Sequence, residues 1–413
     1  MSQAPSGTGP ESHLVEILMG NHGTAGPYDA YRRLRESAPV LRSRSGVLVL
    51  SRYADCDAAL RNRHLGKLDE SLGFRLTAVP EELSRSAMKR FRRTMLFRNP
   101  PDHARLRRLV TDVFTNRHVA QLRSSIARWS DTLLEAASSH GEIDAIASVA
   151  LPLPVHVISD LVGVPVADRE QAAPLVRALV APLEPTAGAD DVRRAADAEN
   201  QLAEYFSHLL AEKRTDPQDD LLSRISHAQG DDTLDPEEAV GTAILLFAAG
   251  FETTSNLIGN GLAALLTHPA QRSMVLAHPE LTPNAIEELL RYDTPVQTNG
   301  RTALAPTSIA GVDVAEGDIV LTLLGAVNRD PARFSDPEAL DVTRASPSPL
   351  SFGAGIHFCL GAGLARAEGA ELFPRLLARF PRMELAAEPQ WRSGLTFRGL
   401  NSLPGSSALT WVP

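Results

Sequence analysis

The sequence predicts a mainly α-helical fold with small β-sheets, and three observations support this. Apolar residues recur with helical spacing along most of the 413 residues, which is the main sequence signal for amphipathic helices. Only three short runs are strand-like, and one of them alternates with the period of two that is typical of strands. One helical run, residues 236–267, is far longer than the usual helix of about 12 residues.

The elements follow one another along the chain. Five helical segments are expected before the long helix: residues 28–37, 53–62, 105–115, 119–138 and 197–213. Strand-like runs cover residues 47–50, 309–320 and 408–412. The second of these runs turns at Gly311 and Gly317, as a β-hairpin does. A further helix is expected over residues 362–377, directly after a glycine-rich loop.

Composition favours one ordinary globular domain. Hydrophobic residues make up 43% of the chain and charged residues 22%, which is enough to bury a sizeable core. No composition break or linker divides residues 13–413, so we expect a single domain after a flexible tail of residues 1–12. The formal net charge of −9 disfavours a nucleic-acid partner.

Targeting signals are not evident. Two cysteines are too few for a disulfide framework and fit a reducing compartment. The first residues lack the apolar core of a signal peptide, and no apolar run reaches the length of about 18 residues that spans a membrane. We therefore expect a cytoplasmic protein without a membrane partner.

The long helix contains an unusual polar centre. Asp235, Pro236 and Glu238 form a helix-start pattern with a capping box. The helix is apolar nearly all round, so it should be buried, yet Ala249 and Gly250 are followed by Glu252 and two threonines. Such costly polar groups are expected at functional sites. The alternative is structural: the Thr253 hydroxyl bonds its own helix carbonyl, and Glu252 pairs elsewhere.

Two further patterns place charged side chains on one helix face. Glu288 and Arg291 are three residues apart in a helix that begins at Thr282 and ends near Tyr292. Taken alone, they fit an ordinary surface ion pair that contributes little.

His103 and Arg107 are four residues apart, after a helix start expected at Pro101 and Asp102. A surface histidine is the alternative here.

The most informative segment runs from Phe352 to Gly361 and contains Cys359, one of the two cysteines. Gly355 and Gly361 are expected to let the backbone curl close to the sulfur. The helix that follows adds the positive end of its dipole, which favours a thiolate. Phe352 can cover the sulfur. We interpret Cys359 as the axial ligand of a haem iron; the alternative is an inert buried cysteine.

The spacing Phe-x-x-Gly-x-His-x-Cys-x-Gly resembles the haem-binding signature of the cytochrome P-450 monooxygenases, the family in which a cysteine thiolate ligates haem and favours O–O cleavage. The other patterns occur in this family's order, over roughly 300 residues. The resemblance implies the fold of that family and haem b, iron protoporphyrin IX, as the cofactor.

The resemblance also implies roles for individual residues. Glu252 and Thr253 would relay protons to bound O2, and Ala249 and Gly250 would make room for it. Contacts to the haem and its propionates are implied for His103, Arg107, Arg301, Phe352, His357 and Gly361, with Cys359 on the iron. Arg344 would complete a structural charge triad with Glu288 and Arg291.

The implied reaction puts one atom of O2 into a substrate and releases the other as water. Because no flavin or iron–sulfur segment is present, electrons are expected from NAD(P)H through a separate ferredoxin reductase and ferredoxin. Two alternatives stay open. A peroxide-driven enzyme of the same fold would not need the acid–threonine pair, and a non-catalytic haem sensor or carrier would not need the polar helix centre.

The substrate is expected to be a lipophilic secondary metabolite, hydroxylated or epoxidised. Family analogy places its contacts in the loop of residues 68–96 and at Leu245, Ala248, Val296, Thr298, Leu400 and Asn401. The basic cluster consists of Arg85, Lys89, Arg90, Arg92, Arg93 and Arg98. It is either a solvated charge run or an attractor for an acidic substrate group or a carrier protein that bears the substrate.

Overall fold

The structure is a computed structural model that describes residues 9–67, 79, 88–138, 142–228, 234–345 and 347–406. The chain divides into two compact units. Unit 1 comprises residues 1–67, 260–359 and 389–401, and unit 2 comprises residues 68–259, 360–388 and 402–413. The mainly helical class with small sheets is confirmed.

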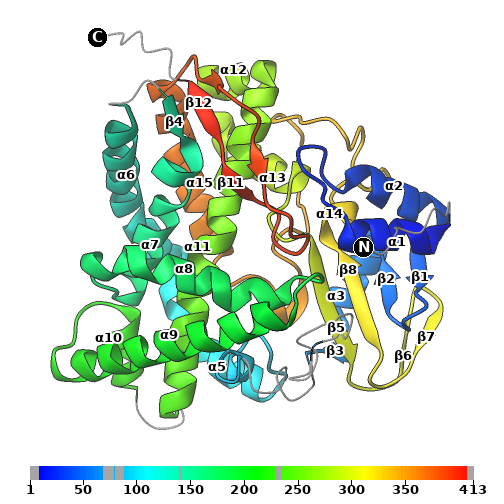
Figure 1. Ribbon diagram of the computed structural model, residues 1–413, viewed down its shortest axis with the longest axis horizontal. Coiled ribbons are helices and arrows are strands. Elements are labelled where there is room, and N and C mark those ends of the chain that lie inside the picture. The colour runs from blue at the N-terminus through cyan, green and yellow to red at the C-terminus, as the bar shows by residue number, and fades with distance from the viewer. Residues whose placement is uncertain are drawn as a thin grey trace. The chain divides into compact units, whose positions relative to one another are not determined.

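Unit 1 contains a five-stranded mixed sheet with the strand order β1-β2-β8-β5-β3 (Figure 1). Its strands are β1 (Val40–Arg42), β2 (Leu48–Leu50), β3 (Leu65–Gly66), β5 (Thr298–Ala303) and β8 (Ile319–Leu323). Only the β2–β8 pair is parallel. A hairpin of β6 (Thr307–Ile309) and β7 (Val312–Val314) confirms the turn expected at Gly311.

The α-helices of unit 1 come from both of its longer chain segments. They are α1 (Pro10–Met19), α2 (Tyr28–Ser37), α3 (Tyr53–Arg61), α12 (Pro269–Ala277), α13 (Thr282–Tyr292) and α14 (Leu324–Val327). Strands β10 (Gln390–Trp391) and β11 (Leu400–Ser402) pair with each other. Leu48 and Val320 from the sheet pack with Leu60 of α3 and with Leu350. This cluster also includes Cys56, whose thiol donates to the Leu50 carbonyl at 3.4 Å.

Unit 2 is built mainly from helices. They are α5 (Asp102–Thr111), α6 (Asn116–Ser138), α7 (Pro152–Val162), α8 (Arg169–Val180), α9 (Ala189–Thr215), α10 (Leu221–Ser226) and α15 (Ala362–Arg379). A three-stranded sheet joins β4 (Glu142–Asp144), β12 (Pro404–Ser406) and β9 (Glu384–Leu385), in that order. The long helix α11 (Pro236–Thr267) belongs to unit 2 up to Gly259.

The expected helices are all present, but α9 begins eight residues before the segment predicted over 197–213, and the other ends shift by at most four residues. The capping box of α11 is confirmed: the Glu238 N–H donates to Asp235 Oδ1 at 2.8 Å, and the Asp235 N–H donates to Glu238 Oε2 at 3.1 Å. Helix α1 was not expected, and its first three residues belong to the segment predicted as a tail. The strand predicted over residues 408–412 lies outside the described residues.

Candidate functional site

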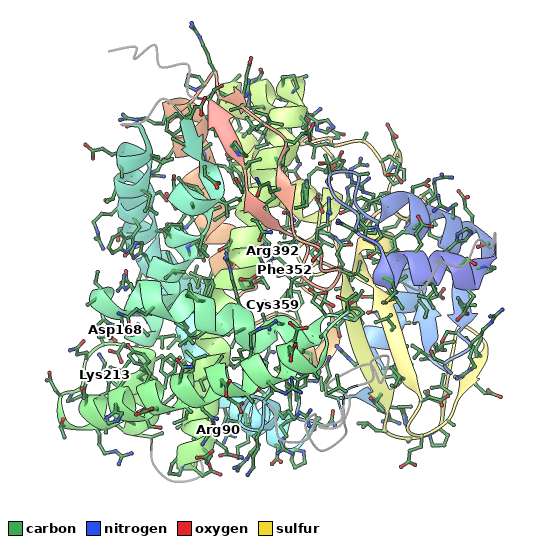
Figure 2. The ribbon with its side chains drawn as sticks, viewed as in Figure 1. Arg90, Asp168, Lys213, Phe352, Cys359 and Arg392 are labelled. Carbon is green, nitrogen blue, oxygen red and sulfur yellow. The ribbon has the colours of Figure 1, made fainter. Side chains whose placement is uncertain are left out.

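The loop that carries Cys359 is shaped by one glycine in particular. Gly355 has a φ of +71°, and a Cβ on it would lie 2.3 Å from the Leu60 carbonyl oxygen, so no side chain fits there. The Cys359 N–H donates to the Phe352 carbonyl at 3.0 Å and closes the loop. The Cys359 thiol itself is exposed, and Figure 2 labels it beside Phe352.

The expectation for Gly361 was wrong. Its φ is −82°, which any residue adopts, and a Cβ there would meet only Phe114 at 4.0 Å. Its backbone therefore does not require a glycine. Gly355 alone of the two carries the conformational argument.

The two cysteines differ sharply in their surroundings. Burial raises the pKa of the Cys56 thiol well above its usual value, because a charged thiolate is disfavoured in an apolar core. Cys359 is exposed in a glycine loop that ends shortly before α15 begins along the chain. Of the two, Cys359 is the one suited to bind a metal as a thiolate.

The centre of α11 carries the acid and the hydroxyls. Glu252 is 3% exposed, and its Oε2 lies 3.6 Å from Nε of Arg177 on α8. The Thr253 hydroxyl donates to the Ala249 carbonyl at 3.1 Å. These contacts match the structural alternative, in which the hydroxyl bonds its own helix and the acid pairs elsewhere. The proton-relay role of Glu252 and Thr253 stays a prediction. Arg177 was missed by the sequence analysis, because nothing local links α8 to α11.

Small residues at this point of α11 have different uses. A Cβ on Gly250 would lie 2.4 Å from Cγ1 of Ile158 on α7, so this glycine permits the close approach of two helices. Ala249 is exposed, although most of α11 is buried. Leu245 and Ala248, predicted to contact substrate, are 3% and 2% exposed.

On α5, the structure brings His103 and Arg107 together as their spacing predicts. His103 is 4% exposed rather than a surface histidine. Burial first, and then the neighbouring Arg107, lower the pKa of His103 below its usual value. A neutral imidazole beside a guanidinium can donate a hydrogen bond to an anion.

Arg301 on β5 is a buried cation. It is 2% exposed and donates to the Gly300 carbonyl at 3.0 Å and to Asn299 Oδ1. Burial lowers its pKa to about 10. None of the residues that the structure describes gives it a carboxylate partner, which suits a site for an external anion. His357, the other propionate candidate of unit 1, is half-buried in the short helix η9 (Gly355–His357).

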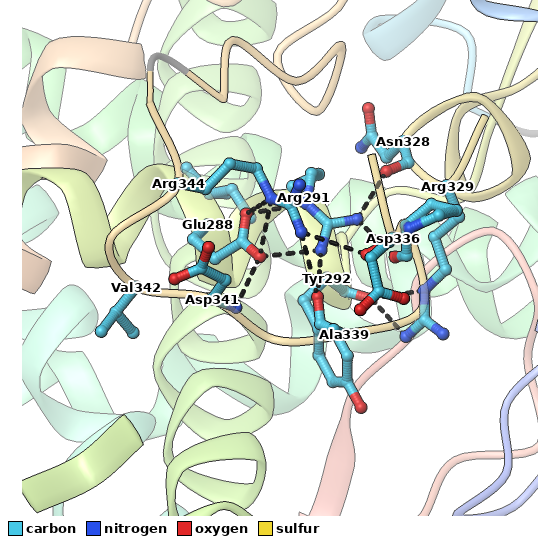
Figure 3. Close-up of polar contacts among 12 residues, drawn as sticks. Glu288, Arg291, Tyr292, Asn328, Arg329, Asp336, Ala339, Asp341, Val342 and Arg344 are labelled. Atoms are coloured by element: carbon cyan, nitrogen blue, oxygen red, sulfur yellow. Dashed lines mark hydrogen bonds and ion pairs between the residues drawn. The ribbon is translucent and has the colours of Figure 1, made fainter. Parts of the chain in front are cut away.

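The charge triad is assembled inside unit 1 (Figure 3). Arg291 and Glu288 are fully buried and form two hydrogen bonds, of 2.7 and 2.8 Å. Arg344 approaches Glu288 Oε2 to 3.1 Å. Arg291 also donates to the carbonyls of Pro337 and Ala339, both at 2.7 Å. The triad thus ties helix α13 to the segment of residues 328–344, and it is not a surface ion pair.

The remaining substrate candidates belong to unit 1. Thr298 is 8% exposed and Leu400 is 1% exposed, while Val296 forms a β-bridge with Phe397. Asn401 is exposed. Most of the predicted substrate loop, residues 68–78 and 80–87, lies outside the described residues.

The basic cluster is partly neutralised within unit 2. Arg90 lies 2.7 Å from Glu237, and Arg93 lies 2.8 Å from Asp235. These acids form the start of α11, so part of the cluster holds this helix end in place. Arg85 lies outside the described residues.

The residues present fit a haem. The loop offers an exposed thiol as iron ligand, and Arg301 offers a buried cation that suits a propionate. Both groups belong to unit 1. Within the described segments, no helix is long and apolar enough to cross a membrane.

Comparison with known proteins gives consistent matches. The family model described as cytochrome P-450 matches residues 47–391. The cytochrome P-450 monooxygenase PikC of Streptomyces venezuelae is 36% identical, with 98% of this chain and 97% of that protein covered. The 6-deoxyerythronolide B hydroxylase of Saccharopolyspora erythraea is 35% identical, with 91% and 95% covered.

A solved structure extends the likeness to the fold. The structure of P-450 BioI in complex with an acyl carrier protein ligated to hexadec-9Z-enoic acid has a TM-score of 0.85 and 34% identity. The match covers 92% of this chain and 98% of that one.

Proposed function

Because the chain belongs to the cytochrome P-450 family of haem monooxygenases, we propose that it oxidises a lipophilic secondary metabolite, with electrons from NAD(P)H delivered by a ferredoxin and its reductase. The observation that carries this proposal is Cys359, an exposed thiol in a loop whose Gly355 admits no side chain. Bound haem b would supply O2 activation, which a thiolate ligand favours.

The residues of the chain divide the supporting tasks. Cys359 would ligate the iron, with Phe352 beside it to limit access of water. His103, Arg107, Arg301 and His357 would hold the propionates by charge-assisted hydrogen bonds. Glu252 would receive a proton from the solvent side, where Arg177 is 39% exposed, and Thr253 would pass it on through its hydroxyl.

The test of the haem-thiolate assignment is the variant Cys359→Ser, with Cys56→Ala as the matched control. The Ser variant should fold but bind little haem, or bind haem without the red-shifted absorption band that a thiolate gives in the reduced carbonyl complex. The Cys56→Ala variant should keep that band. A thiolate band that persists in Cys359→Ser would remove Cys359 as the ligand.

The electron source and the open alternatives are tested by turnover. A surrogate ferredoxin system should support product formation with NAD(P)H, because Glu252 and Thr253 are suited to deliver the protons that O2 activation consumes. A peroxide-driven enzyme would instead turn over with peroxide alone. A sensor or carrier would form product under neither condition.

We further propose that the substrate is a polyketide-like or acyl compound, free or attached to a carrier protein. The hydroxylase relative acts, by its name, on 6-deoxyerythronolide B, and the BioI structure contains an acyl carrier protein. Titration of the ferric protein with free and carrier-bound acyl compounds, without ferredoxin, discriminates the two forms by the shift in haem absorption. If the basic cluster recruits an acidic carrier, added salt should weaken the binding of the carrier-bound compound and leave the binding of the free compound unchanged.

A further inference from the structure

Two segments of unit 1 carry the substrate contacts that are predicted in that unit: residues 295–298 and residues 396–401. An antiparallel β-bridge joins the segments at Val296 and Phe397. One backbone hydrogen bond on either side of this bridge, of 3.0 and 2.9 Å, also connects them. The segments thus run side by side, and their register sets the distance between the substrate contacts that they carry.

A buried ion pair lies beside this pairing. Arg398 Nε donates to Asp293 Oδ1 at 2.7 Å, and the two side chains are 6% and 10% exposed. The same carboxylate oxygen accepts a hydrogen bond from the Tyr28 hydroxyl at 2.5 Å. Burial first, and then the charge of Asp293, raise the pKa of Tyr28 above its usual value, so this hydroxyl stays a donor. The ion pair therefore links the end of α13 to the second segment.

A neutral side chain bridges the same two places. The Asn260 amide of α11 is 1% exposed. Its Nδ2 donates to the Arg398 carbonyl at 3.0 Å and to the Asp293 carbonyl at 3.4 Å. The backbone of both ion-pair partners is thus held by one amide. We call Asn260, Asp293 and Arg398 the clamp.

A buried ion pair is an inefficient way to stabilise a fold. Removing two charges from water costs free energy that their attraction largely repays, and an apolar pair of similar volume is often as stable. The pair differs from an apolar contact in its geometry, because a guanidinium and a carboxylate bond in defined directions. This matters for two short segments, since a slip of one residue turns every side chain of a strand to the other face.

We propose that the clamp fixes the register of the two segments and thereby determines which sizes of ligand the chain accepts. Its members are positioning residues, because the predicted substrate contacts are made by their neighbours along the chain. A ligand large enough to touch both segments depends on the clamp, whereas a ligand that touches neither does not. The inference rests on the proposed function, which supplies the haem and the predicted substrate contacts.

The test compares a small and a bulky probe, imidazole and 1-tritylimidazole, whose ring nitrogen binds ferric haem and shifts its absorption. The clamp variant carries both Asp293→Asn and Arg398→Met, so that no buried charge is left without its partner. It should bind 1-tritylimidazole about tenfold more weakly than the wild type does, because a residue that acts through packed neighbours commonly changes affinity by about this factor. Its affinity for imidazole should equal that of the wild type.

A second buried ion pair supplies the matched control. Lys213 and Asp220 of unit 2 have side chains that are 8% and 5% exposed, and neither lies in a predicted substrate segment. The variant with Lys213→Met and Asp220→Asn should bind both probes as the wild type does. The variant Arg398→Lys keeps the charge of the clamp, and its affinity for 1-tritylimidazole should lie between those of the wild type and the clamp variant.

Three outcomes would overturn the proposal. The clamp variant could bind 1-tritylimidazole like the wild type, it could lose affinity for both probes equally, or the control variant could show the same selective loss. If the clamp variant holds no haem, Asn260→Ala takes its place with the same expectations, because this change removes the bridging amide and no charge.

A second arm measures the register without a haem ligand. The Gln297 N–H donates to the Thr396 carbonyl across the two segments at 3.0 Å. Its hydrogen exchange should become about tenfold faster in the clamp variant and stay unchanged in the control variant, because local opening exposes the amide. Unchanged exchange in the clamp variant would contradict the clamp. A wild type whose absorption does not respond to imidazole would instead contradict the proposed haem-binding function.

Discussion

The Thr253 hydroxyl is a single donor with two competing uses. In the structure it donates to the Ala249 carbonyl at 3.1 Å, as hydroxyls inside helices commonly do. Its oxygen can still accept a proton from one partner while the donor turns to another. The adjacent Glu252 is buried and lies near Arg177, so a carboxyl group stands one residue away along the helix. The observed contacts are those of helix packing, so only a functional measurement can reveal a relay.

The variant Thr253→Ala should separate NAD(P)H consumption from product formation. Removing the hydroxyl leaves electron delivery intact but interrupts proton transfer, so most of the electrons should appear as peroxide or water. We expect product per NAD(P)H to fall roughly tenfold or more, within the range of general acid–base effects. The measurement compares NAD(P)H consumed, product formed and peroxide released.

The neighbouring Thr254 supplies the control. Its hydroxyl makes the same kind of bond, to the Gly250 carbonyl at 3.1 Å, and the residue is 4% exposed. The Thr254→Ala variant should keep its coupling, and Thr253→Ser should recover most of it. Equal coupling in the wild type and in Thr253→Ala would leave Thr253 as a packing residue.

At the scale of elements, the crossing of α7 and α11 depends on Gly250. Ile158 occupies the space that a Cβ would take, at 2.4 Å from its ideal position. The variant Gly250→Ala should therefore destabilise unit 2 by about 1–3 kcal/mol, the usual cost of overpacking. Chemical unfolding of the holoprotein measures this change.

A second substitution identifies the cause of the destabilisation. Ile158→Ala removes the colliding atoms, so Gly250→Ala should cost much less in its presence, and the two changes should couple. If Gly250→Ala is equally costly in both backgrounds, the glycine is needed for something other than helix packing. If Gly250→Ala keeps normal stability but loses activity, the result would favour a role for Gly250 in making room for O2.

The triad of Glu288, Arg291 and Arg344 ties α13 to the segment of residues 328–344. Because Glu288 and Arg291 are fully buried, removing the carboxylate would leave two cations without compensation. We expect Glu288→Gln to destabilise the protein by about 3–5 kcal/mol. Thermal unfolding and retained haem are the measurements. The control is Glu371→Gln, because Glu371 pairs with Arg123, which is half-exposed; a similar loss there would contradict the argument from burial.

At the scale of the whole molecule, the sequence predicted what depends on local spacing. The α11 capping box and the bounds of α13 follow from residues within a few positions of one another. The Glu288–Arg291 pair could be anticipated because its members share a helix turn, whereas Arg344 was implied by the family resemblance alone. Cys359 was identified by its immediate neighbours. In each case the physical cause lies within one element or one loop.

Contacts between distant segments were not accessible in this way. Lys67 meets the Gly300 carbonyl across a separation of 233 residues, and only the pairing of β3 with β5 reveals it. Arg177 and the three-stranded sheet of unit 2 likewise depend on tertiary packing. Gly361 shows the opposite error: its position beside Cys359 suggested a conformational need that its φ does not have.

Glu368 gives the molecule a pH-dependent stability. It lies on α15 and is 1% exposed, and within the described part of the chain its Oε2 has no hydrogen-bond partner. Burial raises the pKa of this carboxyl well above its usual value. The folded protein therefore keeps a proton that the unfolded chain releases above about pH 4.5. The contribution of this carboxyl to the stability of the fold is fully present below about pH 4.5, and it is lost as the pH rises toward the pKa of Glu368 in the folded protein.

The variant Glu368→Gln should remove this dependence, because an amide does not titrate. Between about pH 5 and 8 the wild type should lose stability relative to the variant, by at most about 1.4 kcal/mol per pH unit. Melting temperatures of both holoproteins across this range measure the difference. Glu135→Gln makes the same charge change at an exposed position of α6. For each variant, the difference in melting temperature from the wild type is plotted against pH. The effect of burial is the amount by which the slope for Glu368→Gln exceeds the slope for Glu135→Gln. Equal slopes in the two variants, or a wild type that gains stability relative to Glu368→Gln as pH rises, would show that Glu368 is ionised in the folded protein and has a partner there.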